Sequence, residues 1–365
     1  MGIFLFIVIL FVLVLVHEFG HFYTAKKLGI RVLEFGFGFP PKLWGKKIGD
    51  TEYTINAIPF GGFVRIFGEQ GDSETANTPG SFSAQPAWKK ALVMIAGVVC
   101  NFLLAWVLYT TGFMIGMPTA VSPEEMNRNT SIHDIHLLVT EVRPSTPAAL
   151  AGIIPGDIIV SLSSKGKIVT ESITPQVLQD YVASHGAQKI TIDIIRAQQP
   201  LTVEVVPEIS DKGAKPVIGV AIDLVGTVKL GLLDALSEGF THTVQMLKMT
   251  ISQFGTLIRD AVLGKANLDQ VSGPIGIARI VGSAYEYGIL YVLSIAALIS
   301  INLAVLNLIP FPALDGGRLL FLFIEKITGK NMSPKILGIV NMVGFGILIL
   351  LMIVVTFKDI VNLIK

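Results

Sequence analysis

The chain has 365 residues, of which 52% are hydrophobic and only 15% are charged, and its formal net charge is +1. Soluble domains carry about 25% charged residues, so this chain is poor in charge, and its apolar residues gather in long runs typical of membrane spans. The near-zero net charge gives no basic bias toward nucleic acid, and a single cysteine, Cys100, excludes an intrachain disulfide.

Residues 1–25 form the first predicted transmembrane helix. An apolar run of about 20 residues is long enough to cross a hydrocarbon core of roughly 30 Å. A signal peptide is the alternative, but no small-residue cleavage site follows the run, and the sequence HEFGH continues the helix. Two histidines and a glutamate at membrane depth are costly unless something compensates for their burial.

The HEFGH sequence predicts a metal site. His17 and His21 are four residues apart, so they lie one turn apart on one face of a helix. Imidazole pairs at this spacing suit zinc, and Glu18, beside the first histidine, lies where a general base would stand. The alternatives are a polar patch that faces the bundle interior and a proton relay in a transporter. A zinc hydrolase needs a third protein ligand and leaves the fourth position to water.

A cytoplasmic segment is predicted for residues 26–87. Within it, residues from about 51 to 69 alternate in places and contain two glycines after Pro59, a pattern typical of a β-hairpin. The stretch has too many apolar residues for a two-stranded hairpin in water. The alternative is an ordinary loop docked on a cytoplasmic domain. Residues 34–44, aromatic and rich in Gly and Pro, are interpreted as an interfacial turn.

The second transmembrane helix is predicted at residues 88–115, introduced by Trp88 and two lysines as interfacial anchors. Ala96, Gly97 and Asn101 give this helix a small-residue surface and one polar group, which indicate close helix packing rather than chemistry.

The region between the second and third spans is predicted to contain one folded module. A linker at 116–136 precedes residues 137–210, whose strand-like and helix-like runs predict a small α+β domain. A second linker, 211–287, contains an amphipathic juxtamembrane helix at about 229–264, expected along the outer membrane surface. Residues 271–282, with their glycines and proline, suggest a turn.

The third and fourth transmembrane helices are predicted at 288–312 and 336–357, joined by a cytoplasmic loop at 313–335. Pro310 and Pro312 interrupt the end of the third span, and unwound backbone at membrane depth is tolerated only where it lines a cavity.

Asp315 directly follows this break, and Gly316 and Gly317 permit a turn that aims its carboxylate. The alternative makes Asp315 the N-cap of a cytoplasmic helix. Because the two-histidine site lacks a third ligand, metal ligation is the favoured interpretation. The expected depths of the two residues in the membrane also agree with ligation. His17 lies roughly 21 Å along the first span, and Asp315 follows the end of the third span, so both lie toward the cytoplasmic side.

The orientation follows from lysine and arginine, which gather on the cytoplasmic side of membrane proteins. They are concentrated in the segment after the first span and in the loop between the third and fourth: Lys26, Lys27, Arg31, Lys42, Lys46, Lys47, Arg65, Lys89 and Lys90, then Arg318, Lys326, Lys330 and Lys335. Both termini and the segment 116–287 are therefore expected outside the cytoplasm.

HEFGH in the first span and N-x-x-P-x-P-x-L-D-G-G in the third resemble the site-2 protease family of intramembrane zinc metalloproteases, in particular bacterial regulator-of-sigma-E proteases. The resemblance covers nearly the whole chain. The family's Ala-Gly…Asn-Phe pattern, matched at Ala96, Gly97 and Asn101 of the second span, implies packing against the first span rather than chemistry.

The resemblance implies Zn²⁺ as the cofactor, His17, His21 and Asp315 as its ligands, and Glu18 as the base for the attacking water. It also implies that Asn307 helps hold the substrate backbone or the oxyanion; the alternative is a polar helix contact.

The fold expected from this resemblance is a polytopic α-helical membrane protein with four transmembrane helices, a membrane re-entrant β-hairpin at about 51–69 and one inserted domain. The string S-x-P-A-x-x-A-G-x-x-x-G-D within 137–210 resembles a PDZ domain. No clear second copy is present, whereas several family members carry two. The hairpin is expected to pair with an unwound substrate by strand addition.

The predicted function is that of a zinc endopeptidase of the bacterial cytoplasmic (inner) membrane that cleaves transmembrane segments in regulated intramembrane proteolysis. The resemblance implies single-span substrates, such as anti-sigma factors or remnant signal peptides. Other expected partners are the lipid bilayer and a peptide or substrate that regulates through the PDZ-like domain, with no nucleic acid.

Two other classes of function remain as alternatives. A non-catalytic PDZ membrane scaffold with a structural metal would have no use for a base at Glu18. A metal or proton transporter would need acidic or histidine groups along further spans, and the second and fourth offer none.

Overall fold

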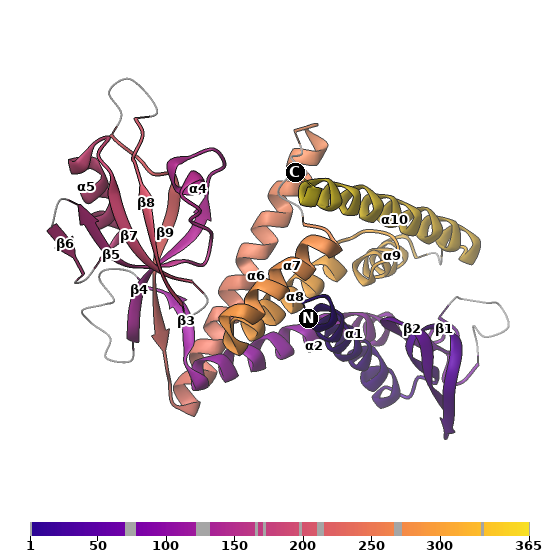
Figure 1. Ribbon diagram of the computed structural model, residues 1–365. Coiled ribbons are helices and arrows are strands. Elements are labelled where there is room, and N and C mark those ends of the chain that lie inside the picture. The colour runs from indigo at the N-terminus through magenta and orange to yellow at the C-terminus, as the bar shows by residue number, and fades with distance from the viewer. Residues whose placement is uncertain are drawn as a thin grey trace. The chain divides into compact units, whose positions relative to one another are not determined.

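The computed structural model describes residues 2–69, 78–121, 132–164, 167–170, 173–196, 199–209, 215–265, 272–329 and 332–364. The chain divides into two compact units, one made of Met1–Thr111 and Leu236–Lys365 and the other of Gly112–Ala235. The elements of both units are labelled in Figure 1, and each unit is described by itself.

The first unit contains four long apolar helices, among the described residues, that have the length and composition to cross a membrane. They are α1 (Gly2–Lys27), α2 (Ala87–Ile115), α8 (Ile289–Leu308) and α10 (Pro334–Ile364). Large apolar side chains remain exposed along α10, such as Met342 at 69% and Leu350 at 62%, as expected for a helix that faces lipid. Four candidate spans were expected and four are found among the described residues, although α8 ends at Leu308, before the predicted bound of 312.

The backbones of α1 and α2 lie in close contact. At Gly20 of α1, an added Cβ would lie 2.5 Å from the carbonyl oxygen of Ala96 in α2. This spacing is possible only for glycine, so the two helices approach as small-residue interfaces allow in membranes.

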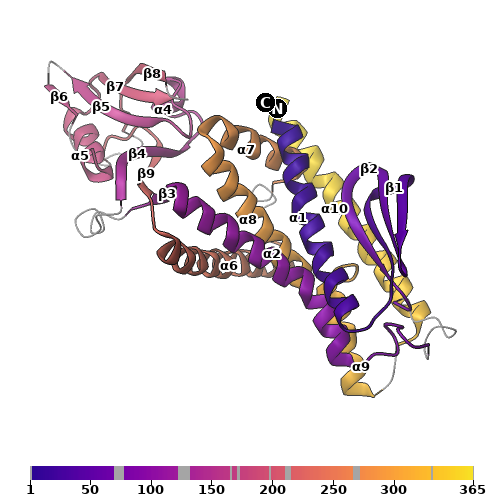
Figure 2. The same cartoon turned by 90° about the horizontal axis from the view of Figure 1, so that it is seen from below.

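Strands β1 (Val32–Ile48) and β2 (Thr51–Ile66) form a small sheet that lies beside α1 (Figure 2). Residues 34–37 of β1 pair with residues 52–55 of β2 and also with residues 62–65. Residues 42–48 pair with residues 51–56. The interpretation of 34–44 as a turn was therefore wrong, and β1 supplies the pairing partner for both halves of the predicted hairpin.

The described part of the first unit contains three further helices: α6 (Leu232–Val262), which begins in the second unit, α7 (Pro274–Tyr287) and α9 (Asp315–Thr328). Helix α6 contacts α2, where the Trp106 indole N–H donates to the Leu236 carbonyl at 2.9 Å. Helix α7 replaces the turn suggested for 271–282, of which residue 271 lies outside the described residues. Its proline occupies the start of the helix, where a missing N–H costs nothing.

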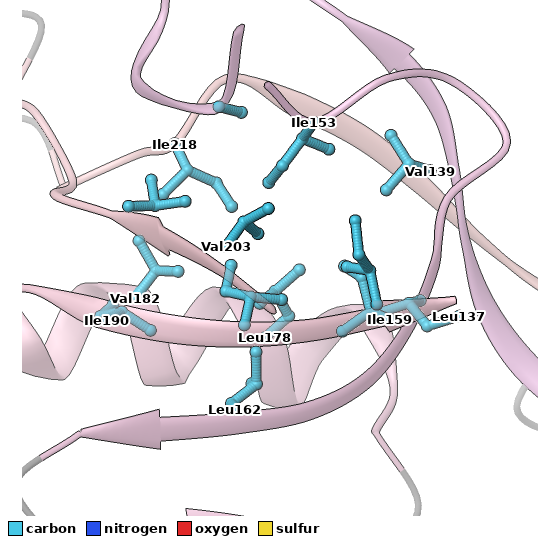
Figure 3. Packing of buried hydrophobic residues seen from close by; sticks show 14 of the residues in the cluster. Leu137, Val139, Ile153, Ile159, Leu162, Leu178, Val182, Ile190, Val203 and Ile218 are labelled. Carbon is cyan, nitrogen blue, oxygen red and sulfur yellow. The ribbon is translucent and has the colours of Figure 1, made fainter. Parts of the chain in front are cut away.

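The second unit is an α+β domain around one sheet, with strand order β3-β9-β4-β5-β7-β8 and β6 paired to β5. Its described elements are β3 (Met117–Ala120), β4 (Ile132–Val142), α4 (Pro147–Leu150), β5 (Ile158–Ser164), β6 (Lys167–Val169), α5 (Pro175–His185), β7 (Ile190–Arg196), β8 (Gln199–Val205) and β9 (Val220–Val228). Aliphatic side chains from the strands pack with Leu178 and Val182 of α5 (Figure 3).

The sheet extends beyond the bounds 137–210 expected for this domain. Strand β3 lies in the predicted linker 116–136, whose residues 122–131 are outside the described part, and β9 lies in the predicted linker 211–287. Strand β9 pairs with both β3 and β4, so sequence-distant strands close the sheet. Strands β3 and β9 are short and far apart in the sequence, so neither stretch of sequence by itself indicates that the two strands pair.

Candidate metal centre

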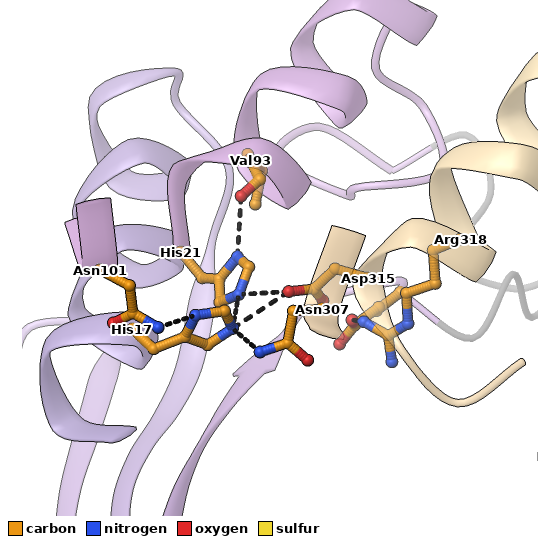
Figure 4. Close-up of polar contacts among 8 residues, drawn as sticks. His17, His21, Val93, Asn101, Asn307, Asp315 and Arg318 are labelled. Carbon is orange, nitrogen blue, oxygen red and sulfur yellow. Dashed lines mark hydrogen bonds and ion pairs between the residues drawn. The ribbon is translucent and has the colours of Figure 1, made fainter. Parts of the chain in front are cut away.

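Three side chains from two helices converge in the first unit. His17 and His21 lie on one face of α1, and Asp315 is the first residue of α9. Their ligand atoms form a nearly equilateral triangle, with His17 Nε2 and His21 Nε2 at 3.1 and 3.2 Å from Asp315 Oδ2 and 3.1 Å from each other (Figure 4). The predicted ligands are thus brought together across 298 residues of sequence.

The break between α8 and α9 positions Asp315. Helix α8 ends at Leu308, and the two prolines follow before α9 begins. The unwound backbone is partly held by α10, where the Asn341 side chain accepts from the Ala313 N–H at 3.2 Å. Ala313 has a φ of +74°, an uncommon conformation for a residue with a Cβ, two positions before the carboxylate.

Gly316 and Gly317 are required by the same turn. A Cβ at Gly316 would lie 2.3 Å from the Ile309 carbonyl oxygen, and one at Gly317 would lie 2.2 Å from that of Phe311. The N-cap of α9 is Leu314, so Asp315 does not have the capping role considered from the sequence. Its carboxylate is directed to the histidines instead.

The triangle fits a zinc ion. With bonds of about 2.0–2.2 Å, two ligands of a tetrahedral zinc are separated by about 3.3–3.6 Å. The observed separations of 3.1–3.2 Å need only a slight outward movement to reach this spacing. Although burial favours the neutral acid, hydrogen bonds with the two imidazoles hold the pKa of Asp315 well below its usual range. An ionised carboxylate is the form in which an aspartate binds a metal.

The outer ring nitrogens of both histidines also have partners. His21 Nδ1 lies 2.8 Å from the Val93 carbonyl oxygen, and His17 Nδ1 lies 3.3 Å from Asn101 Nδ2. Gly97 lies on α2 between Val93 and Asn101, and its lack of a side chain lets the helix lie directly against the two imidazoles. A Cβ at Gly97 would lie 2.5 Å from His21 Nε2. Such second partners orient the ligands of a metal site.

The sequence analysis missed this face of α2. Asn101 was interpreted as a packing residue, and Val93 was not singled out. The spacing of Val93, Gly97 and Asn101, each four residues apart, places them on one side of a helix. Packing of this surface against the first span was expected, and α2 does contact α1 there, but no role toward the histidines was predicted for Val93 or Asn101.

A cavity of about 290 Å³ adjoins the three ligands. Glu18 and Asn307 line it together with the ligands, so all five predicted site residues border one space. Asn307 Nδ2 lies 3.3 Å from His17 Nε2. Residues Phe63, Val64 and Ile66 of β2 form another wall, and Glu69 and Arg318 make an ion pair at its edge.

Comparison with known proteins identifies relatives along most of the chain. The profile of peptidase family M50 matches residues 5–351. A relative from Clostridium perfringens is 35% identical over 350 residues, covering 96% of this chain and 95% of the relative. The regulator of sigma-E protease from Escherichia coli is 30% identical, covering 97% of both chains.

One solved structure matches part of the chain. The PDZ domain of an SdrC-like protein from Listeria monocytogenes covers 24% of this chain and 86% of that domain, with 22% identity and a TM-score of 0.21.

Proposed function

The chain belongs to peptidase family M50 and is an intramembrane zinc metalloprotease, and on that basis we propose that His17, His21 and Asp315 hold its zinc. The observation that carries this assignment is the triangle of ligand atoms 3.1–3.2 Å apart, beside a glutamate in one cavity. Zinc, when bound there, supplies a Lewis acid that lowers the pKa of water and polarises a carbonyl.

Glu18 is the proposed general base. It follows the first ligand on α1 and borders the same cavity, but the ligand triangle is complete without it. Its carboxylate takes a proton from the attacking water and then delivers that proton to the amine nitrogen of the leaving product. Asn307 is proposed to donate a hydrogen bond from Nδ2 to the substrate carbonyl oxygen as negative charge develops on it.

The sheet of β1 and β2 is proposed to enter the membrane beside α1. The Phe35 ring lies 4.9 Å from that of Phe22, and the Phe37 ring lies 3.8 Å from that of Phe11. Phe22 and Phe11 are separated by roughly 16 Å along the helix, with His17 between them. These contacts support a sheet that passes the level of the metal centre.

The same sheet is proposed to bind the substrate. A transmembrane helix shields its own carbonyls by hydrogen bonding, so it must unwind before hydrolysis. Residues Phe63, Val64 and Ile66 of β2 border the cavity, which supports strand addition at this position. An extended substrate there would present its backbone to Glu18 and the zinc ligands.

The proposed substrates are single-span membrane proteins already shortened on the outer side, including proteins that resemble anti-sigma factors and remnant signal peptides. The relative from Escherichia coli is named a regulator of sigma-E protease, and a substrate that controls a sigma factor would fit that name. We further propose that the second unit is an extracytoplasmic PDZ-like domain that regulates substrate access. Its buried Asp157, from the Gly-Asp end of the predicted string, accepts hydrogen bonds from Arg196 and from the Ile154 N–H.

Replacement of Glu18 by glutamine tests the catalytic assignment. Glutamine keeps the side-chain size but cannot accept the proton, so cleavage of a panel of tagged single-span substrates should fall by about 10²- to 10⁴-fold. Zinc content should stay at the parental level, because Glu18 is not a ligand. Both quantities are measured on the purified full chain, by gel assay and by elemental analysis.

Asp315→Ala is the matched comparison. It should lose zinc and activity together, since one of three protein ligands is gone. Parental cleavage by Glu18→Gln would remove Glu18 from the base role, and full zinc occupancy in Asp315→Ala would remove Asp315 from the ligand set.

A further inference from the structure

We infer that Asn101 is a positioning residue of the metal centre: its side-chain oxygen accepts the Nδ1–H of His17 and fixes the tautomer that leaves Nε2 free to bind zinc. The inference rests on the proposed zinc ligands and adds to them a residue of α2 that does not touch the metal.

The position of Asn101 is the first observation. Its side chain is completely buried, at 0% exposure, and its amide nitrogen lies 3.3 Å from His17 Nδ1. The amide oxygen of Asn101 has no hydrogen-bond partner among the described residues. A buried polar atom without a partner costs about 1–3 kcal/mol, so this oxygen needs an explanation.

The second observation is the matching contact of the other histidine. The Val93 carbonyl can only accept, so His21 Nδ1 must carry a proton at 2.8 Å, and once the Nε2 proton that hydrogen-bonds Asp315 is lost, Nε2 offers its lone pair to zinc. A histidine that binds a metal through Nε2 needs this tautomer. His17 needs the same tautomer, and Asn101 is the polar side chain beside its Nδ1.

The two orientations of the Asn101 amide have different consequences. With the NH₂ group toward the ring, Nδ1 must accept, Nε2 carries the proton, and the lone pair that zinc needs is lost. With the amide turned by 180°, the oxygen accepts the Nδ1–H and is no longer without a partner, at nearly the same shape. The metal-bound state therefore selects the second orientation.

Contacts of the backbone hold Asn101 in this position. The Ser300 hydroxyl of α8 donates to the Asn101 carbonyl oxygen at 2.8 Å. Gly97, one turn earlier on α2, allows the helix to lie directly against the two imidazoles. Helix α2 thus supplies a Nδ1 partner for each histidine, Val93 for His21 and Asn101 for His17.

Zinc affinity of the purified full chain, measured by competition with a chromophoric chelator, tests the inference. Asn101→Leu keeps the approximate size but cannot accept, and should weaken zinc binding by about 10- to 100-fold, the usual effect of losing such a partner. Asn101→Asp provides a carboxylate oxygen at the same place and should bind zinc at least as tightly as the parent. The matched control is Asn302→Leu, which removes a polar contact with Thr250 in the same bundle and should leave affinity unchanged.

The outcomes separate this inference from the ligand assignment. Parental affinity in Asn101→Leu would overturn it, and so would equal losses in the leucine and aspartate variants, because an acceptor would then not rescue binding. Asp315→Ala, measured alongside, tests the ligands themselves. Zinc binding that depends on Asp315 but not on Asn101 would contradict the inference alone and leave the proposed function intact.

Discussion

Gly97 shows how closely the metal centre depends on a missing side chain. A Cβ there would lie 2.5 Å from His21 Nε2 and 2.8 Å from His17 Nε2. Both atoms are proposed zinc ligands. A single methyl group at Gly97 would therefore clash with both imidazoles where their ligand atoms converge.

Gly97→Ala should therefore weaken zinc binding. Overpacking costs about 1–3 kcal/mol, which corresponds to about a 5- to 150-fold loss of affinity if it acts on the bound state. The control is Gly346→Ala in α10, where no atom lies within 4 Å of the added Cβ. Equal zinc affinity in the two variants would show that α2 does not press on the ligands.

The convergence of His17, His21 and Asp315, the proposed ligands, was predictable from sequence because the signals are local. The four-residue spacing of His17 and His21 and the proline break before Asp315 can be read without a structure. The role proposed for Asn101 could not be predicted in this way, because packing of its helix against the first span does not say which atom of which histidine it contacts. A buried asparagine in a span has the same sequence signal whether it packs or positions a ligand.

Among the elements, the sheet of β1 and β2 has two dissimilar ends. Ile48 lies at one end, where it pairs with Thr51 across a turn at residues 49–50, and Ile58 lies at the other, paired with Phe39. Both isoleucines have exposed side chains, at 56% and 45%. A sheet that enters the membrane would place Ile58 in lipid and Ile48 in water.

This difference can be measured with a fluorophore. In a Cys100→Ser background, single cysteines at Ile58 and Ile48 are labelled with an environment-sensitive dye in liposomes. The label at Ile58 should respond to a quencher carried on lipid chains, and the label at Ile48 to a water-soluble quencher. Quenching of both labels by the aqueous reagent alone would contradict membrane entry.

The helices were more predictable than the strands. Four apolar runs of sufficient length identify spans, since their signal lies within each run. Residues 34–44 were misread because Gly and Pro punctuate a strand whose partners, 52–55 and 62–65, come later in the sequence. Helix α7 was misread because a proline that starts a helix looks like one that breaks it.

For the molecule as a whole, the charge distribution and the four apolar helices predict an orientation in the membrane. Basic residues follow α1 and lie between α8 and α10, so those segments should be cytoplasmic. The second unit lies between α2 and α8 in the chain, and should therefore be extracytoplasmic.

Reporter fusions test this orientation. A phosphatase that is active only outside the cytoplasm should be active when fused after Glu208 and inactive when fused after Gly329. Fluorescent protein fusions at the same two positions should give the reverse pattern. Activity of the phosphatase at Gly329 would invert the orientation and place the second unit in the cytoplasm.

The division of the first unit into two stretches of sequence has a consequence for biosynthesis. His17 and Asp315 are 298 residues apart, and the second unit is made between them. At about 5–20 residues per second, a ribosome needs roughly 15–60 s to travel from one to the other. During that interval the nascent chain has both histidines and the glutamate in the membrane but no complete ligand set. If Asp315 is the third ligand, a protease whose substrates are membrane segments acquires the means to cut them only after its own first three spans and its second unit have been synthesised.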